Sequence, residues 1–416
     1  MEIKRKRVIL VSAYGCEPFK GSEAGVGWNW VLQMAKNDEV HVITRKNNKE
    51  AIENNIPNEI QHNLRFYYYD TSNLFLKFKK RDKGIYLYNI FWQIGIISLI
   101  KRLKRENIFD YSMHLSFGSF WMPTFLPFFK IPFIWGPLGG GECVPKTFLK
   151  EFPFKQRVVQ KIRYWLIATS FLNPLVVFPC KKAAVILVRT NNSLEIVPKR
   201  FRYKAKVVLE TAMENEVFKY KRNVERKNDN VFKIISTGRL VPFKNIVSSI
   251  RAISLLDKGL NIQYKIIGIG HERKSLIKEI ENYGLQGKVE ILNEMSRVEI
   301  LHELANSDVY LFPSLREGGT WALMEAMAIG LPCICLNWTG MNIITSEDSA
   351  FRLEVTNPNQ MPIDIASVLC KIIENRNYAN QIGDNARQRI MQQFNWNQKG
   401  SFMKDLFYEL EKGRLK

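Results

Sequence analysis

The sequence predicts an α/β protein built from two Rossmann-like, doubly wound domains that face one another across a cleft. Strand-like segments alternate with helical ones through both halves of the chain, which is typical of parallel sheets covered by helices. With 416 residues the chain is long enough for two domains, and its composition, 46% hydrophobic and 24% charged, is that of a globular protein. We place the first domain in residues 1–213, the second in 214–393 and a C-terminal helical segment in 394–416.

The first half opens on an apolar run that predicts a strand at residues 7–13. Gly15 and Pro18 interrupt this run soon after its basic start, which favours a strand over a signal peptide. A glycine-rich loop, GCEPFKGSEAGVG, leads to a predicted helix at residues 28–36. Further strands are predicted at residues 40–44, 64–69, 111–115, 132–135, 184–189 and 206–209.

The second half repeats the alternation more regularly. Residues 214–230 are charged and poor in aliphatic side chains, so we interpret them as a linker. Helices are expected between the strands, for example at residues 245–256 and 272–283, and through roughly the last 50 residues. The predicted strands lie at residues 232–236, 263–267, 289–292, 309–312 and 333–336.

The formal net charge of +21 indicates an anionic partner: nucleic acid, an anionic membrane surface or a phosphorylated substrate. No nucleic-acid-binding motif accompanies the charge, so nucleic acid is not favoured. A solvated, lysine-rich surface without a partner stays open as an alternative. The six cysteines show no paired spacing, which disfavours a disulfide-built secreted protein and favours the reducing cytoplasm.

Two segments, residues 77–105 and 144–177, mix basic and aromatic side chains. The apolar part of the first, residues 85–100, is shorter than the roughly 20 residues that span a bilayer. Basic and aromatic residues together suit a surface that lies on anionic lipid, so we expect peripheral contact with a membrane. The alternative, that each segment is an ordinary amphipathic helix covering a sheet, stays open.

The stretch STGRLVPFKN follows the first strand of the second domain. In open α/β sheets, ligands bind beyond the carboxyl ends of the strands. Gly238 allows a tight exit from the strand, and Arg239 and Lys244 can reach the cleft. Two cations beside a strand end suit a diphosphate, although both could also be plain surface residues.

A helix predicted at residues 321–329 is apolar throughout except for Glu325. Such a helix should be buried, and a buried carboxylate is unfavourable unless another group pairs with it. Glu325 could accept two hydrogen bonds from a ribose diol at the carboxyl end of the sheet. We therefore predict that Glu325 binds a ribose.

The entrance of this helix predicts an anion site. Thr320 is an acceptable N-cap, and Gly318 and Gly319 leave the helix N-terminus open to an anion. Glu317, on the loop before the helix, is placed where the hydroxyl groups of a donor sugar would lie.

These motifs together resemble the retaining GT-B glycosyltransferases of family 4. Seven residues separate Glu317 from Glu325, as in the family's hallmark pair of glutamates, and Arg239 and Lys244 match its diphosphate-binding cations. The resemblance implies a nucleotide-sugar-binding second domain and an acceptor-side first domain. The sequence departs from the family's usual Glu-Gly-Phe-Gly at Gly319, which alters the pocket near the donor sugar.

The first half and the C-terminus add to the resemblance. Gly21 and Ser22 in KGSEAGVGW match the family's glycine-rich loop. His114 in FDYSMHLS matches the family's histidine after an N-domain strand, and we expect it to end its strand and to orient the donor sugar. FNW at residues 394–396 matches the start of the family's C-terminal helix that crosses back to the first domain. GSEAGVGWNW with WGPLGGGE resembles a subgroup associated with bacterial surface polysaccharides.

With the cysteine usage and the basic-aromatic segments, we expect a cytoplasmic enzyme, peripheral on the inner face of the plasma membrane. It would transfer a hexosyl group with retention from a nucleotide-diphosphate sugar to a glycan or polyprenyl-linked acceptor. Its catalytic residues would be His114 and Glu317. We find no Asp-x-Asp motif and expect neither a metal nor a cofactor, because Arg239, Lys244 and the helix start can stabilise the leaving group. Two rival functions stay open: a non-catalytic nucleotide-sugar-binding subunit and a GT-B-fold epimerase.

Overall fold

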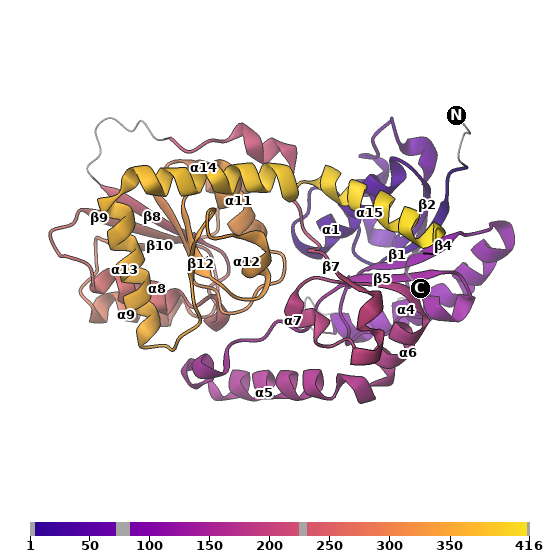
Figure 1. The fold of residues 1–416 in the computed structure, drawn as a ribbon, viewed down its shortest axis with the longest axis horizontal. Coiled ribbons are helices and arrows are strands. Elements are labelled where there is room, and N and C mark those ends of the chain that lie inside the picture. The colour runs from indigo at the N-terminus through magenta and orange to yellow at the C-terminus, as the bar shows by residue number, and fades with distance from the viewer. Residues whose placement is uncertain (1–4, 72–83, 224–230, 414–416) are drawn as a thin grey trace. The chain divides into compact units, whose positions relative to one another are not determined.

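The computed structural model describes residues 5–71, 84–223 and 231–413, and its contacts divide the chain into two compact units (Figure 1). Unit 1 contains Met1–Gly141, Leu166–Glu210 and Trp396–Lys416. Unit 2 contains Glu142–Trp165 and Thr211–Asn395. Each unit is built around one parallel sheet.

Within the described residues, unit 1 has a seven-stranded sheet in the order β3-β2-β1-β4-β5-β6-β7. The strand order reverses between β1 and β4, because β2 follows on one side of β1 and β4 lies on the other. The strands are β1 Val8–Ala13, β2 Glu39–Arg45, β3 Leu64–Tyr69, β4 Tyr111–Ser116, β5 Phe133–Leu138, β6 Ala183–Val188 and β7 Ala205–Val207. The helices are α1 Ser22–Ala35, α2 Lys49–Glu53, α4 Ile85–Glu106, α6 Pro174–Lys182, α7 Asn191–Leu194 and α15 Trp396–Glu411.

The described part of unit 2 has a six-stranded sheet in the order β10-β9-β8-β11-β12-β13, with the reversal between β8 and β11. The strands are β8 Phe232–Thr237, β9 Ile262–Ile267, β10 Val289–Leu292, β11 Val309–Phe312, β12 Cys333–Leu336 and β13 Phe351–Leu353. The helices are α8 Ile246–Ser254, α9 Arg273–Asn282, α10 Arg297–Ala305, α11 Trp321–Ile329, α12 Thr339–Ile344, α13 Gln360–Glu374 and α14 Arg376–Gln393. Helix α5, Phe154–Ala168, belongs to this unit as far as Trp165.

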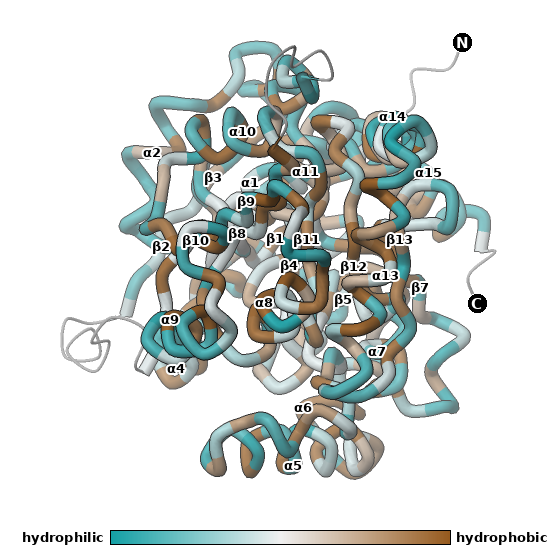
Figure 2. The backbone as a smooth tube through the Cα atoms, turned by 90° about the vertical axis from the view of Figure 1, so that its left-hand side faces the viewer, coloured by the Kyte–Doolittle hydropathy of each residue, from teal (hydrophilic) through white to brown (hydrophobic). Residues whose placement is uncertain are grey.

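The central strands are buried on both faces, as expected for parallel sheets covered by helices. All residues of β4, β5, β11 and β12 are buried, and β12, whose four residues are all apolar, is hydrophobic in Figure 2. Trp92 and Trp135 fill the core of unit 1. The helix α11 lies in the core of unit 2, where α14 packs against it.

The predicted doubly wound architecture is confirmed, and several strands, β3 and β10–β12 among them, have the predicted bounds. Helix α1 begins at Ser22, earlier than predicted, because its glycines serve close packing and do not break the helix. A Cβ on Gly27 would lie 2.0 Å from the carbonyl oxygen of Gly15. The short strand β13 was missed, since three residues carry too little periodicity to predict a strand.

Two segments belong to the unit that is not their neighbour in the chain. The predicted C-terminal helix that returns to the first domain is confirmed, since α15 packs against α1 in unit 1. Residues 142–165, which we assigned to the first domain, pack instead with unit 2. Phe148 is buried there, and the hydroxyl of Thr147 donates to the carbonyl of Thr356.

Of the predicted linker, residues 224–230 lie outside the described part. None of the described helices is both long and apolar enough to cross a membrane.

Candidate active site

The loops after β8 and β11 meet where the strand order of unit 2 reverses, the position at which ligands bind in doubly wound sheets. Gly238 leaves β8 with φ +133°, a conformation that favours glycine. A short turn, Pro242–Lys244, then ends at Asn245, which has φ +55°. Arg239 is exposed beside this turn, and no carboxylate among the described residues forms an ion pair with it.

Lys244 and Glu317 form an ion pair across the two loops. Nζ of Lys244 lies 2.5 Å from Oε1 of Glu317, and the hydroxyl of Ser314 donates to the same oxygen at 2.6 Å. The two charged side chains are 12% and 13% exposed, so the pair is mostly shielded from water. The lysine ammonium also lies 4.7 Å from the centre of the Phe312 ring. A largely buried cation held in one position is a suitable partner for a phosphate oxygen.

Glu325 lies inside α11 with only 9% of its surface exposed, as the sequence predicts. Its partner in the structure is Arg297, the first residue of α10, whose Nε donates to Oε1 of Glu325 at 2.8 Å. The same guanidinium donates to Glu214 at 2.5 Å. Burial raises the pKa of Glu325, and the Arg297 charge acts against that shift. Sequence reasoning missed Arg297, because nothing in SRVE beyond a helix-capping pattern singles it out.

Gly319 at the entrance of α11, and Gly340 beside it, have a packing reason. A Cβ on Gly319 would lie 2.1 Å from the hydroxyl of Thr211, and a Cβ on Gly340 would lie 1.8 Å from the carbonyl of Gly318. Thr320 is the N-cap residue, but its side chain makes no capping hydrogen bond. The first turn of α11 is therefore not closed by its own cap.

Arg316 adds positive charge next to Glu317 and was not predicted as a site residue. Its guanidinium lies 4.4 Å from the centre of the Phe243 ring. Burial lowers its pKa to about 10, and the nearby Arg163 charge acts in the same direction. Two like charges at this position make an anion favourable there.

At the corresponding reversal in unit 1, the loops after β1 and β4 are joined by short hydrogen bonds. The amide of Gly15 donates to the hydroxyl of Ser116 at 2.9 Å, and the amide of Gly118 donates to Glu23 at 2.6 Å. Arg189, after β6, donates to the carbonyl of Gly118 and lies 3.4 Å from Glu210. Sequence reasoning missed Glu23, Arg189 and Glu210, which come together only in the folded unit.

The predicted residues of unit 1 lie around the same strand ends. Gly21 is the N-cap residue of α1 and Ser22 its first residue, so the glycine-rich loop leads directly into a helix. His114 was expected to end its strand, but it is the fourth of the six residues of β4 and is 1% exposed. Its Nδ1 makes no hydrogen bond within the described part of the chain. Burial lowers the pKa of His114 to about 4, so the imidazole is neutral at neutral pH.

The match to a known family falls on unit 2. Residues 217–389 match the family model of the glycosyl transferases group 1. These residues are a group 1 glycosyl transferase domain. It contains Arg239, Lys244, Arg297, Glu317, Gly318, Gly319, Thr320 and Glu325, whereas Gly21, Ser22 and His114 lie outside it.

Several curated relatives of this chain are named for the biosynthesis of a polysaccharide. A putative colanic acid biosynthesis glycosyltransferase of Escherichia coli K12 is 34% identical over 125 residues, which is 28% of this chain and 31% of that protein. An Escherichia coli galactosyltransferase, named for UDP-Gal and α-D-GlcNAc-diphosphoundecaprenol, is 28% identical over 189 residues, 44% of this chain and 47% of that protein. The matched regions thus span less than half the length of these relatives.

Solved structures resemble the whole fold. Anabaena HepE, solved in complex with UDP, has a TM-score of 0.63 at 12% identity, covering 97% of this chain and all 100% of that one. A glycosyltransferase of Rickettsia africae has a TM-score of 0.64 at 14% identity, covering 98% of this chain and 99% of that one. The predicted GT-B fold, with two Rossmann-like domains, is confirmed. At this level of identity the likeness concerns the fold alone.

Proposed function

We propose that this chain is a retaining, metal-independent glycosyltransferase of family 4. It moves a hexosyl group from a nucleotide-diphosphate sugar to a glycan or polyprenyl-linked acceptor in bacterial cell-surface polysaccharide biosynthesis. It works in the cytoplasm, peripherally on the inner face of the plasma membrane. The names of the relatives support this reaction class, since they describe polysaccharide assembly and, in one case, a diphosphoundecaprenol acceptor.

One observation carries the proposal: the Lys244–Glu317 pair at the strand-order reversal of the group 1 domain. Lys244, the exposed Arg239 and the start of α11 provide positive charge where the loops after β8 and β11 meet. This arrangement suits the diphosphate of a leaving nucleotide. Glu317 then receives the sugar hydroxyls, and Glu325 receives the ribose hydroxyls through its oxygen atoms. The Arg297 charge lowers the pKa of Glu325 against the effect of burial, which favours the ionised form that accepts those hydrogen bonds.

In the proposed transfer, the bond between C1 of the donor sugar and the diphosphate oxygen breaks, and its electron pair leaves with the phosphate. Arg239 and Lys244 stabilise the charge that develops on that oxygen, so no bound metal is required. The acceptor hydroxyl forms its bond to C1 on the same face, which retains the configuration, and its proton passes to the departing phosphate. The reacting sugar passes through an oxocarbenium-like state.

His114 keeps its proposed role in orienting the donor sugar. A neutral imidazole with an unpartnered, buried Nδ1 is suited to one hydrogen bond with a sugar hydroxyl. It is not suited to carrying a permanent positive charge at neutral pH.

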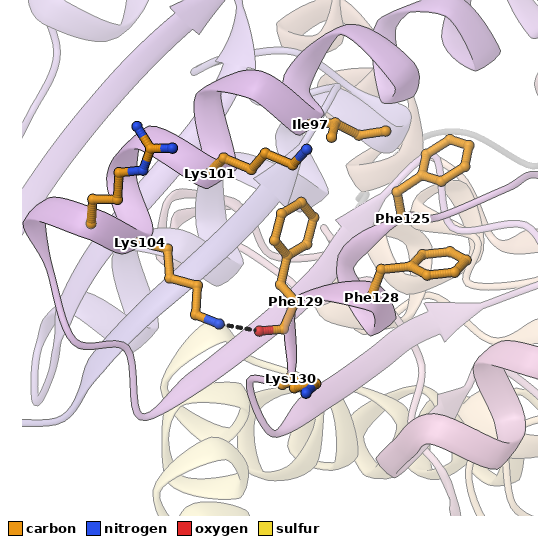
Figure 3. A pocket seen from close by; sticks show the side chains of 8 residues that line it. Ile97, Lys101, Lys104, Phe125, Phe128, Phe129 and Lys130 are labelled. Carbon is orange, nitrogen blue, oxygen red and sulfur yellow. Dashed lines mark hydrogen bonds between the residues drawn. The ribbon is translucent and has the colours of Figure 1, made fainter.

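Membrane contact is supported by a groove in unit 1 (Figure 3). The groove has a volume of about 770 Å³, and apolar and basic side chains line it, with no carboxylate among them. Nζ of Lys104 is held by the carbonyl of Phe129 at 2.6 Å. Of the basic-aromatic segment at 77–105, residues up to 83 lie outside the described part. The lining residues are Ile97, Lys101, Lys104, Arg105, Phe125, Phe128, Phe129 and Lys130.

Product analysis tests the proposal. The protein is incubated with a panel of UDP- and GDP-sugars, with and without a polyprenyl-diphosphate glycan acceptor, and products are identified by mass spectrometry and NMR. We expect sugar transfer only with acceptor, and an anomeric configuration equal to that of the donor. Donor binding without any turnover would indicate a binding subunit, and interconversion of the free nucleotide sugar would indicate an epimerase.

A further inference from the structure

Helix α5 has its apolar side turned away from the protein. Phe154, Val158, Ile162 and Trp165 are spaced by four, four and three residues, so they lie along one side of the helix. All four are exposed, Phe154 by 74% and Trp165 by 63%, and Val159 beside them is 55% exposed. A helix that covers a sheet should show the opposite arrangement.

The polar side of α5 is the side that faces the protein. Gln160 is buried, and the amide of Gln156 lies 3.3 Å from the ring of His271. The hydroxyl of Tyr164 donates to the carbonyl of Val144 at 2.6 Å, and Arg163 lies near the carbonyl of Glu142. These contacts fix the rotation of the helix about its axis, so the outward apolar side is a property of the fold.

The segment before α5 anchors it to unit 2. Phe148 and Phe152 are both buried, and they line a cavity of about 220 Å³ together with residues of α8 and α9. Glu151 lies 3.7 Å from Arg251 of α8. The helix is thus attached to the unit that contains the group 1 domain.

The apolar side of α5 could be covered by a second copy of the chain or by a lipid surface, and the charge of the helix favours the lipid surface. The helix contains Lys155, Arg157, Lys161 and Arg163 and no acidic residue, and both lysines are exposed. A second copy of the chain docking through this side would bring two such cationic helices together, which is unfavourable. An anionic lipid surface attracts the cations and takes up the aromatic and aliphatic side chains.

We infer that α5 is an interfacial membrane helix, which inserts Phe154, Val158, Ile162 and Trp165 among the acyl chains of an anionic bilayer. The inference rests on the proposed peripheral location and names the surface responsible in unit 2. It differs from contact through the groove beside α4, because the two surfaces belong to different units. It also gives the group 1 domain its own attachment to the membrane.

The test uses the full chain and vesicles of equal parts phosphatidylglycerol and phosphatidylcholine. Ile162→Glu is compared with Ile363→Glu, a matched control on helix α13 of the same unit, because both isoleucines are 51% exposed. We expect Ile162→Glu to weaken co-sedimentation at least about tenfold, because it removes an inserted side chain and adds a charge that anionic lipid repels. Ile363→Glu should bind like the wild type.

A second α5 variant, thermal unfolding and sedimentation velocity separate the possible explanations of the vesicle result. If Ile162→Glu proves unstable, Phe154→Glu should show the same loss of vesicle binding. Thermal unfolding checks that each variant is folded. If the wild type fails to bind these vesicles, the membrane part of the proposed function is wrong. If the wild type binds and both α5 variants bind equally well, α5 is not the inserted element. If Ile162→Glu instead dissociates a dimer in sedimentation velocity and leaves vesicle binding intact, the occupant is a second copy.

Discussion

The strand-order reversals of the two units differ in charge. In unit 2 the loops after β8 and β11 hold Lys244 and Glu317 in a largely buried pair, with Arg239 exposed beside them. In unit 1 the strand β4 at the reversal carries His114, which burial keeps neutral, and the cation near it, Arg189, lies between the carboxylates of Glu23 and Glu210. The same topology therefore supports two kinds of chemistry: fixed cations suit a diphosphate, and a neutral imidazole suits an uncharged hydroxyl. The prediction with the largest expected effect tests the cationic site.

We expect Lys244→Ala to reduce kcat/KM by about 100- to 1,000-fold, equivalent to about 3–4 kcal/mol of transition-state stabilisation. In the proposed mechanism the lysine stabilises the leaving diphosphate, and its side chain is largely shielded from water. Steady-state kinetics with the identified donor measures the effect. The matched control is Lys265→Ala, which breaks another ion pair of unit 2, the 2.7 Å contact between Lys265 and Glu303.

Because Lys244→Ala also leaves Glu317 without its partner, the double variant Lys244→Met with Glu317→Gln serves as a check on folding. It removes both charges together. Equal activity of Lys244→Ala and Lys265→Ala would show that the unit 2 loops do not contact the leaving group.

The second prediction concerns His114 in unit 1, whose neutral state should appear in the pH dependence of the free energy of unfolding. Its pKa of about 4 in the folded chain lies below its ordinary value of 6.5, so between these pH values the unfolded chain binds a proton that the folded chain does not. The free energy of unfolding therefore falls as pH is lowered through this window. At pH 5 the loss from this one group amounts to about 2 kcal/mol relative to pH 7.

Urea unfolding of the wild type and of His114→Gln at pH 7 and pH 5 measures this term. His41, whose pKa is also lowered by burial, contributes equally to both proteins and cancels in the comparison. The variant should lose less stability on acidification. Identical losses would mean that the imidazole titrates normally and that His114 is not held neutral.

A smaller effect is expected at Glu325. Glu325→Gln should weaken nucleoside-diphosphate binding about tenfold, because an amide provides one acceptor oxygen in place of two. Arg297→Ala should raise the pKa of the buried Glu325 further, so the nucleotide affinity of this variant should begin to fall at a higher pH than that of the wild type. Calorimetric titration measures both, with Glu303→Gln as the control. Unchanged affinity in the folded Glu325→Gln protein would remove Glu325 from the ribose site.

The sequence was informative where one residue broke a regular pattern. Glu325 stands out in an apolar helix, so its burial and its need for a partner could be predicted. Its partner Arg297 lies 28 positions earlier in the chain and gave no signal, because the contact depends on how α10 and α11 pack. The two glycine positions were predicted for an open helix entrance. The close contact of Gly319 with the hydroxyl of Thr211 appears only in three dimensions.

The same limit explains why the sequence does not show which side of helix α5 faces the protein. Its sequence shows basic and aromatic residues at helical spacing, which also fits a helix that covers a sheet. Only the buried Gln160 and the exposed Trp165 show which side faces the protein. The attachment of residues 142–165 to unit 2 is equally invisible in the sequence, because it rests on contacts between segments far apart in the chain.

The smallest expected effect concerns metal removal. If Arg239 and Lys244 supply the charge that stabilises the leaving diphosphate, EDTA should change the activity of the wild type by no more than about twofold. The Lys244→Ala protein sharpens the test, because it lacks half of that charge. Added Mg²⁺ should then restore part of its activity while leaving the wild type unaffected, since a divalent cation can bind the same phosphate oxygens. Loss of wild-type activity in EDTA, reversed by a divalent ion, would contradict the metal-independent mechanism and with it the idea that unit 2 carries its own cations for the diphosphate.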